Sequence, residues 1–306
     1  MSAEKIHKAK QQWIGILIAM PALFILFKSM LPTLPSNPML KEAFWAKKVS
    51  ADASYDLVLI GDSRVYRGID PVAIQAQTAL KTLNFGFSSG GLNLDIIDKA
   101  MQHLNPQGAK CLLLAVSPNA LLKSSESNGH YHQIADLSKA DLYIQSTVYE
   151  SLSALHAYAL SDFMKLRVGE KYFEAFKLNT GFVYSNHLPY DSAAALYQYR
   201  QQFSKNSIDT TTAFKLLEAI VKLPSKGFQV VLCRVPTSLK MRQLEDQLTN
   251  DFVPRFLQQA TQAGVRVLDL PIGPFHSYDG SHLDGASAVK LSKVIGDSLS
   301  LIWKTP

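Results

Sequence analysis

Residues 55–66 read YDLVLIGDSRVY, and the rest of the chain is organised around this stretch. The apolar run 56–60 has no alternating polar residues, which predicts a short strand buried on both faces. Gly61 ends the run, and Asp62 and Ser63 follow at once. A serine at this point lies at the carboxyl edge of a sheet, where open α/β folds keep their ligand sites. Gly, Asp and Ser are also common turn formers, so an ordinary turn is the alternative.

Further apolar runs follow, and segments typical of helices separate them. The strand candidates are residues 56–60, 82–87, 109–116, 228–235 and 266–270, and the helix candidates are 71–80, 94–103, 211–223, 243–263 and 286–303. The runs are short, rich in Val, Leu, Ile or Phe, and bounded by turn-forming residues. This alternation predicts an α/β layer structure with a doubly wound sheet of about five parallel strands.

The chain of 306 residues could hold one large domain or two small ones. We assign residues 55–306 to one α/β domain with an insertion at about 119–210. The insertion is rich in Tyr, Ser, His and Asn and has a helix-like piece at 147–168. It lies between the third and fourth predicted strands, so we expect a mainly helical lid or substrate-binding subdomain over the carboxyl edge.

Residues 13–27, WIGILIAMPALFILF, form an uninterrupted apolar run that basic residues precede. With its neighbours the run approaches the roughly 20 residues that span a bilayer. We therefore predict an N-terminal tail at 1–11, a transmembrane signal anchor at 12–32 and a linker at 33–54, stiffened at its start by prolines. A cleaved signal peptide and a buried core helix are the alternatives. The basic residues disfavour the core helix, and the lack of a small-residue cleavage site disfavours cleavage.

The lysines before the apolar run favour a cytoplasmic N-terminus. This orientation predicts a single-pass protein of the bacterial inner membrane, with the α/β domain on the periplasmic side. Lysines also follow the run and weaken this assignment. A cytoplasmic enzyme held by the same helix is therefore the competing topology.

The composition bounds the partners. The chain carries 31 basic and 25 acidic residues, a net charge of +6. The basic residues are scattered and do not interleave with aromatics, so we expect no nucleic acid partner; the excess favours an anionic glycan or membrane surface. Cys111 and Cys233 lie in apolar runs and are expected in the core, and the sequence leaves open whether they pair. The His130-x-His132 pair is a poor match to a metal site, so we expect no metal and no cofactor.

His282 is the most informative of the eight histidines. It lies in residues 275–285, FHSYDGSHLDG, a polar loop between the last predicted strand and the last predicted helix. Gly280 allows a tight turn, in which the Asp279 carboxylate can bind one imidazole nitrogen and leave the other to face Ser63. The alternative is helix capping by Asp284 beside an incidental histidine. The two motifs together favour a nucleophile with its base and orienting acid.

Gly61-Asp62-Ser63 after a buried strand and Asp279-Gly280-Ser281-His282 before the last helix resemble the SGNH (GDSL-type) hydrolase superfamily. The resemblance covers residues 55–120 and 225–303. It implies a flavodoxin-like three-layer α/β/α fold. It also implies that Ser63 is the nucleophile, His282 the base and Asp279 the group that orients the base.

The resemblance further implies an oxyanion hole built from the Ser63 N–H, a backbone N–H after the second strand and an Asn side chain after the third. The second donor falls at Gly90, or at Ser89, in the segment NFGFSSGG. The third falls at Asn119, where the chain reads Ser-Pro-Asn-Ala in place of the family's Gly-x-Asn-Asp. A turn-forming asparagine after proline is the alternative for Asn119.

Arg234 ends the predicted strand 228–235 and should point toward the same edge of the sheet. There it would bind an anionic or sugar group of a substrate. A structural ion pair explains an arginine at this position equally well.

These observations predict a membrane-anchored, extracytoplasmic serine esterase or O-acyltransferase that acts on an ester of a cell-envelope glycan or lipid. The layout of anchor, GDS domain and insertion is similar to that of acyl-transfer proteins that modify envelope polysaccharides. The similarity implies the membrane, the ester or glycan substrate and an envelope polysaccharide assembly complex as partners. The alternative function is a catalytically weak scaffold or binding module of such a complex.

Overall fold

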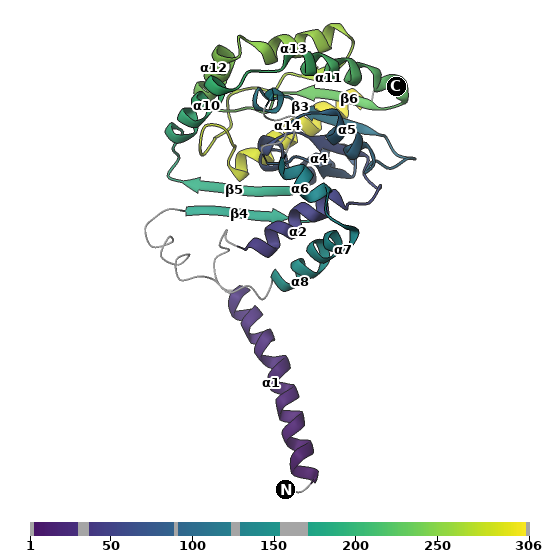
Figure 1. Cartoon of the computed structure of the whole chain (residues 1–306), viewed down its shortest axis with the longest axis vertical. Helices are drawn as coiled ribbons and strands as arrows, with labels where there is room; N and C mark the ends of the chain where they lie inside the picture. Colours follow the sequence, from purple (N-terminus) through teal and green to yellow (C-terminus); the bar gives the residue numbers. More distant parts are fainter. Residues whose placement is uncertain (1–2, 30–36, 89–90, 124–128, 154–170, 304–306) are drawn as a thin grey trace.

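The computed structural model of the chain describes residues 3–29, 37–88, 91–123, 129–153 and 171–303 (Figure 1). Its centre is a five-stranded parallel sheet with the strand order β2-β1-β3-β6-β7. The strands are β1 (Leu57–Ile60), β2 (Thr82–Asn84), β3 (Cys111–Ala115), β6 (Gln229–Cys233) and β7 (Arg266–Leu268). All five predicted strands are present, each trimmed at one or both ends.

The strand order places a topological switch point beside β1. The chain passes from β1 outward to β2 and then returns to β3 on the other side of β1. The loops that follow β1 and β3 therefore diverge at the carboxyl edge and leave a crevice between them, which is the usual ligand position in open α/β sheets. Ser63 follows β1 directly.

Helices cover both faces of the sheet and give three layers, as predicted. One face carries α5 (Leu94–Met101), α11 (Thr210–Lys222) and α13 (Phe252–Gln262), and the other carries α4 (Pro71–Thr78) and α14 (Gly285–Trp303). The chain also forms α3 (Ser63–Gly68) and α12 (Leu239–Leu248) near the carboxyl edge. The single helix predicted at 243–263 is in fact α12 and α13, because Asn250 and Asp251 between them adopt positive φ angles.

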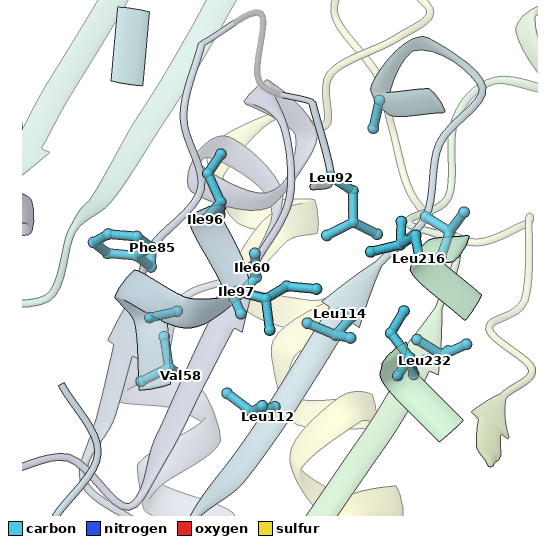
Figure 2. Packing of buried hydrophobic residues seen from close by; sticks show 14 of the residues in the cluster. Val58, Ile60, Phe85, Leu92, Ile96, Ile97, Leu112, Leu114, Leu216 and Leu232 are labelled. Atoms are coloured by element: carbon cyan, nitrogen blue, oxygen red, sulfur yellow. The ribbon is translucent and has the colours of Figure 1, made fainter. Parts of the chain in front are cut away.

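Side chains of the strands alternate between two apolar clusters. Figure 2 shows Val58 and Ile60 of β1 and Leu112 and Leu114 of β3 meeting side chains of the covering helices, among them Ile96, Ile97 and Leu216. Leu57 and Leu59 point the other way, toward α14. Every residue of β1 is buried, which explains the apolar run without polar alternation. Each such side chain stabilises the fold by roughly 1.5–3 kcal/mol relative to exposure.

The N-terminal region differs from its prediction in two respects. Residues 33–54 contain a helix, α2 (Pro38–Val49), which Asn37 caps and whose Phe44 and Trp45 are buried in the core. Pro38 lies within the predicted linker at 33–54, but it occupies the first turn of this helix, where proline is favourable. Helix α1 (Ala3–Ser29) extends away from the sheet domain (Figure 1). Within the described ranges no helix has the length and hydrophobicity to cross a membrane, so the span predicted at 12–32 is not found.

The insertion contains a β-hairpin as well as helices. Its described elements are the 3₁₀ turn Asn119–Leu121, α6 (Gly129–Ala135), α7 (Lys139–Tyr143), the π turn Ile144–Val148, α8 (Tyr149–Ser153), β4 (Lys171–Lys177), β5 (Phe182–Leu188) and α10 (Ala193–Lys205). Strands β4 and β5 pair antiparallel and form a separate two-stranded sheet. The helix predicted at 147–168 starts within these turns, and its part after residue 153 lies outside the described residues.

The two cysteines do not pair. Cys111 and Cys233 are buried free thiols at opposite ends of neighbouring strands, since Cys111 lies opposite Gln229 and Cys233 opposite Ala115.

Candidate active site

Ser63 is held at the first position of α3, directly beyond the end of β1. Asp62 caps this helix, because its Oδ1 accepts a hydrogen bond from the Arg64 N–H at 2.9 Å. The other oxygen, Oδ2, accepts one from Ser117 Oγ at 2.6 Å, which ties the loop after β3 to the loop after β1. Both carboxylate oxygens of this buried acid are therefore occupied, and the serine backbone is fixed.

The loop between β7 and α14 brings a histidine and an aspartate to this serine. His282 Nε2 lies 2.8 Å from Ser63 Oγ, and His282 Nδ1 lies 2.7 Å from Asp279 Oδ2. Gly280 has φ +88°, and a Cβ at this position would lie 2.9 Å from the Ser192 Cβ. The tight turn thus needs glycine, as the sequence predicted. Catalytic triads join a hydroxyl, an imidazole and a carboxylate at hydrogen-bond distances of this kind.

The Asp279 carboxylate is held ionised. Burial alone would raise its pKa, but the His282 ring and the backbone N–H groups of His282 and Ser281 lower the pKa to about 2. The two N–H groups donate to Oδ1 at 2.7 and 2.8 Å, while Oδ2 faces the ring. An ionised Asp279 can therefore fix the imidazole tautomer and stabilise the imidazolium that forms when His282 takes a proton.

Tyr278 and Arg67 form one wall beside the histidine. The Tyr278 ring stacks on the His282 ring with centroids 5.9 Å apart and planes at 16°. Arg67 Nη1 donates to the Tyr278 hydroxyl at 3.1 Å, and Arg67 also forms an ion pair of 2.5 Å with Glu174 of β4. The hairpin of the insertion is thereby attached to the wall of the site.

The triad opens into a cavity of about 520 Å³. Two regions of the insertion contribute to it: Tyr172 and His187 come from the β4–β5 hairpin, and Tyr199 and Gln202 come from α10. The cavity therefore lies between the sheet edge and the insertion, where the sequence placed a substrate-binding subdomain. The other lining residues are Ser63, Tyr66, Arg67, Ser88, Asn119, Tyr278, Asp279 and His282.

Sequence reasoning placed the insertion over the sheet edge but did not identify which of its residues line this cavity. The sequence does not distinguish His187 from an ordinary polar residue, and no motif marks Tyr199 or Gln202. The clustering of Tyr and His in the insertion was the available signal, but it does not say which of these residues reach the serine.

Of the predicted oxyanion donors, Asn119 is among the residues that the structure describes. Asn119 lines the cavity, and its Oδ1 accepts a hydrogen bond from Gln202 Nε2 at 2.5 Å. Gly90 and Ser89 lie outside the described residues. Ser88, just before them, lines the cavity, so this loop does approach the triad.

The chain packs the loop after β2 tightly against α3. A Cβ at Gly86 would lie 2.8 Å from the Tyr66 nitrogen and 2.9 Å from the Val65 Cβ. The Gly86 carbonyl accepts a hydrogen bond of 2.6 Å from Lys48 Nζ, which is buried among aromatic rings of the core. Glycine at this position thus permits the close approach.

Arg234 lies in an ion-pair network and does not line the cavity at Ser63. Its Nη2 donates to Glu245 Oε2 at 3.0 Å, and its Nη1 donates to Asp246 Oδ1 at 2.6 Å. Glu245 is fully buried and also pairs with both terminal nitrogens of Arg64. The structural ion pair, which the sequence left as an alternative, is what the structure shows for Arg234.

Arg64 links this network to the active-site loop. Its Nε donates to Ser281 Oγ at 3.1 Å, and Ser281 Oγ lies 2.8 Å from the Tyr199 hydroxyl. Helix α10 is therefore joined to the His282 loop by one hydrogen bond and to Asn119 by another. Among the residues that the structure describes, no group of three His, Cys, Asp or Glu could hold a metal ion.

Comparison with known proteins gives only distant likenesses. No family model and no curated protein matches the chain. A solved structure provisionally assigned as a platelet activating factor from Streptococcus pneumonia has a TM-score of 0.40 and 13% identity, and covers 93% of this chain and 99% of its own. A carbohydrate acetylesterase family member from Sinorhizobium meliloti has a TM-score of 0.37 and 9% identity, with coverages of 81% and 99%.

An acetyl xylan esterase from Butyrivibrio proteoclasticus has a TM-score of 0.32 and 8% identity, and covers 83% of this chain and 65% of its own. All three TM-scores lie below 0.5. These similarities therefore do not establish the chemistry of the site, which has to be inferred from the residues of this chain.

Proposed function

We propose that this protein is a serine esterase or O-acyltransferase that works through an acyl-enzyme on Ser63. One observation supports the proposal above all others, namely the hydrogen-bonded series Ser63 Oγ, His282 and Asp279 with distances of 2.8 and 2.7 Å. The three residues come from two loops far apart in the chain, and both loops leave the carboxyl edge of the sheet. Such convergence on an open cavity favours nucleophilic catalysis over an ordinary turn.

The proposed reaction has two halves. Ser63 Oγ attacks the ester carbonyl carbon while His282 Nε2 takes the hydroxyl proton, and an oxyanion forms. The bond to the leaving alcohol then breaks, and His282 gives the proton to the alcohol oxygen. Water, or a hydroxyl of an acceptor, next attacks the acyl carbon while His282 takes its proton. The bond between the acyl carbon and Ser63 Oγ then breaks, and His282 gives the proton back to Ser63 Oγ. Water as acceptor gives hydrolysis, and a sugar hydroxyl gives acyl transfer.

Asn119 is proposed to stabilise the oxyanion. The hydrogen bond from Gln202 to Oδ1 fixes which end of the Asn119 amide faces Gln202, and Asn119 lines the cavity at Ser63. A donor that is already oriented stabilises the charge that develops in the transition state without a cost of reorganisation. Gln202 is thus a positioning residue for Asn119. A donor at Gly90 stays a prediction.

The walls of the cavity favour a carbohydrate ester as substrate. Its volume of about 520 Å³ lies within the usual range for small-molecule sites. Tyrosine rings and the His187 ring supply flat apolar faces that carry polar groups at their edges, a combination suited to sugar rings. An ester of a cell-envelope glycan is consistent with these walls, and an envelope assembly complex would supply such a glycan.

Contact with a membrane surface through α1 is part of the proposal. The helix exposes large apolar side chains, among them Leu17 at 69% and Ile18 at 68%, and Lys8 and Lys10 precede them. An exposed apolar helix beside basic residues favours binding to anionic lipid. Flotation with anionic and neutral vesicles would test this, and a variant carrying Leu17→Lys and Ile18→Lys should lose the binding. Equal flotation of the variant would exclude α1 as the lipid contact.

Location outside the cytoplasm is also a proposal. A reporter that is active only in the periplasm, fused after Pro306, should give signal in the full-length protein. Signal instead from a reporter that works only in the cytoplasm would remove envelope glycans from the candidate substrates.

Labelling with a fluorophosphonate probe tests the enzyme proposal. The wild-type protein should form a covalent adduct on Ser63, and Ser63→Ala should form none while its circular dichroism spectrum is unchanged. Ser88→Ala is a matched control, because Ser88 lines the same cavity without contacting His282 in a hydrogen bond. A folded wild-type protein that takes no label would favour the scaffold alternative. Labelling that survives Ser63→Ala would exclude Ser63 as nucleophile.

A further inference from the structure

A second cavity, of about 320 Å³, lies beside α12, α13 and the segment that follows β7. It shares no lining residue with the cavity at Ser63. Most of its walls are apolar, from residues such as Leu257 and Ile272. Its charged residues are Arg234, Arg242 and Asp269.

Arg242 has no anionic partner of its own. Among the described residues its side chain forms no hydrogen bond and no ion pair, and its Nε is shielded from solvent without an acceptor. Burial and the nearby Arg234 lower the pKa of Arg242 to about 10, although the carboxylates of Asp246 and Glu245 act in the opposite direction. A half-buried cation next to another cation is unfavourable unless an anion balances it.

The carboxylates nearest to Arg242 form ion pairs with other arginines. Glu245 pairs with Arg64 and Arg234, and Asp246 pairs with Arg234. The three arginines therefore share two carboxylates, and neither carboxylate forms an ion pair with Arg242. Asp269 also lines the cavity, but it is exposed and forms no ion pair with the described residues.

We propose that this second cavity binds a small oxyanion, with the terminal nitrogens of Arg242 as its main donors and Arg234 as a further positive charge at the wall. Guanidinium groups bind phosphate and carboxylate oxygens with paired hydrogen bonds, and partial burial strengthens the attraction. Inorganic phosphate and the carboxylate of an acidic sugar share this chemistry. The site is independent of the triad, so it does not rest on the proposed esterase activity.

Isothermal titration of the full-length protein tests the proposal, with inorganic phosphate in one arm and glucuronate in the other. Sodium chloride keeps the ionic strength equal throughout, because general salt effects would otherwise imitate binding. Saturable binding of one anion per chain is expected in at least one arm, and the stronger arm identifies the source of the oxyanion. No saturable heat in either arm would overturn the proposal.

Arg242→Gln supplies the second measurement. The variant should bind the anion about tenfold more weakly or worse, since a charge-assisted hydrogen bond is lost. Without anion it should melt at the same temperature as the wild type or higher, because the repulsion from Arg234 is relieved. Arg255→Gln, an exposed arginine on α13, is the matched control and should bind like the wild type.

Equal anion affinity in wild type and Arg242→Gln would also overturn the site. If the variant does not fold, a competition experiment on the wild-type protein tests the site. An equal concentration of chloride should not displace the anion that binds, observed by the ³¹P line width for phosphate and by the titration heat for glucuronate. Displacement by chloride would show non-specific screening and exclude an oxyanion site.

Discussion

Replacing Asp279 by asparagine tests the triad through the tautomer of His282. In the wild type, Oδ1 of Asp279 accepts from the backbone N–H groups of Ser281 and His282, and Oδ2 faces His282 Nδ1. An asparagine would keep its oxygen on the two N–H donors, because an NH₂ group cannot accept there. Its NH₂ would then point at Nδ1 and hold the imidazole with its proton on Nε2. That proton faces Ser63 Oγ, so His282 could no longer act as base.

The expected loss follows from this change. In a triad with the wrong tautomer the rate falls about 10⁴-fold, which is about 5.4 kcal/mol in the activation free energy. Hydrolysis of p-nitrophenyl acetate and the rate of fluorophosphonate labelling both report it. The effect should appear in kcat, with KM little changed, since Asp279 contributes no uniform binding. Asp297→Asn, an exposed acid on α14, is the control and should match the wild type.

The pH dependence of the free energy of unfolding tests the ionisation of Asp279 independently. The folded state lowers the Asp279 pKa from 3.8 to about 2, which is worth about 2 kcal/mol at neutral pH. A group with a lowered pKa stabilises the fold fully above its unfolded pKa, and this stabilisation is lost as the pH falls toward 2. The stability gap between wild type and Asp279→Asn should therefore shrink between about pH 4 and pH 2. A variant within tenfold of the wild-type rate, or a gap that does not change with pH, would refute the reasoning.

Substitutions at three further positions address the surroundings of the triad. Gln202→Leu should lower kcat about tenfold by releasing the amide of Asn119. Gln202→Glu should lower kcat further, because a carboxylate would turn the Asn119 NH₂ toward itself. Steady-state kcat values of both variants equal to that of the wild type would exclude the positioning role of Gln202. Glu245→Gln should destabilise the fold by about 3 kcal/mol or more in urea, because two buried guanidinium groups lose their shared anion, and a change below 1 kcal/mol would contradict the network. Gly280→Ala should greatly lower the rate of fluorophosphonate labelling, because the turn that positions His282 needs a φ of +88°. The strain should lower the free energy of unfolding by only about 1–3 kcal/mol. Undiminished labelling would show that the turn tolerates a side chain.

The local sequence was sufficient wherever a property depends on neighbouring residues. The apolar run before Gly61 predicted a strand buried on both faces, because only such a strand lacks polar alternation, and β1 is buried throughout. The turn at Gly280 and the approach of Asp279 to His282 also followed, since these residues are close in the chain. The prediction failed where a local signal has two meanings. Pro38 was taken as part of a linker, but it starts a helix that supplies Trp45 to the core.

Contacts between distant parts of the chain could not be derived in this way. The sequence offered Arg234 as a substrate ligand or an ion-pair partner, and only the fold shows Glu245 beside it. The same holds for Gln202, which reaches Asn119 because α10 of the insertion packs over the sheet edge.

The sequence by itself therefore determined the five strands and the turn that joins Asp279 to His282, since these follow from hydrophobic periodicity and short-range turn chemistry. The tertiary structure decided what surrounds Ser63: which tyrosines line its cavity, what orients Asn119 and which arginine lacks an anion. Those contacts depend on how separately folded segments pack, and packing is set by shape and charge across the whole domain, which no local pattern of residues records.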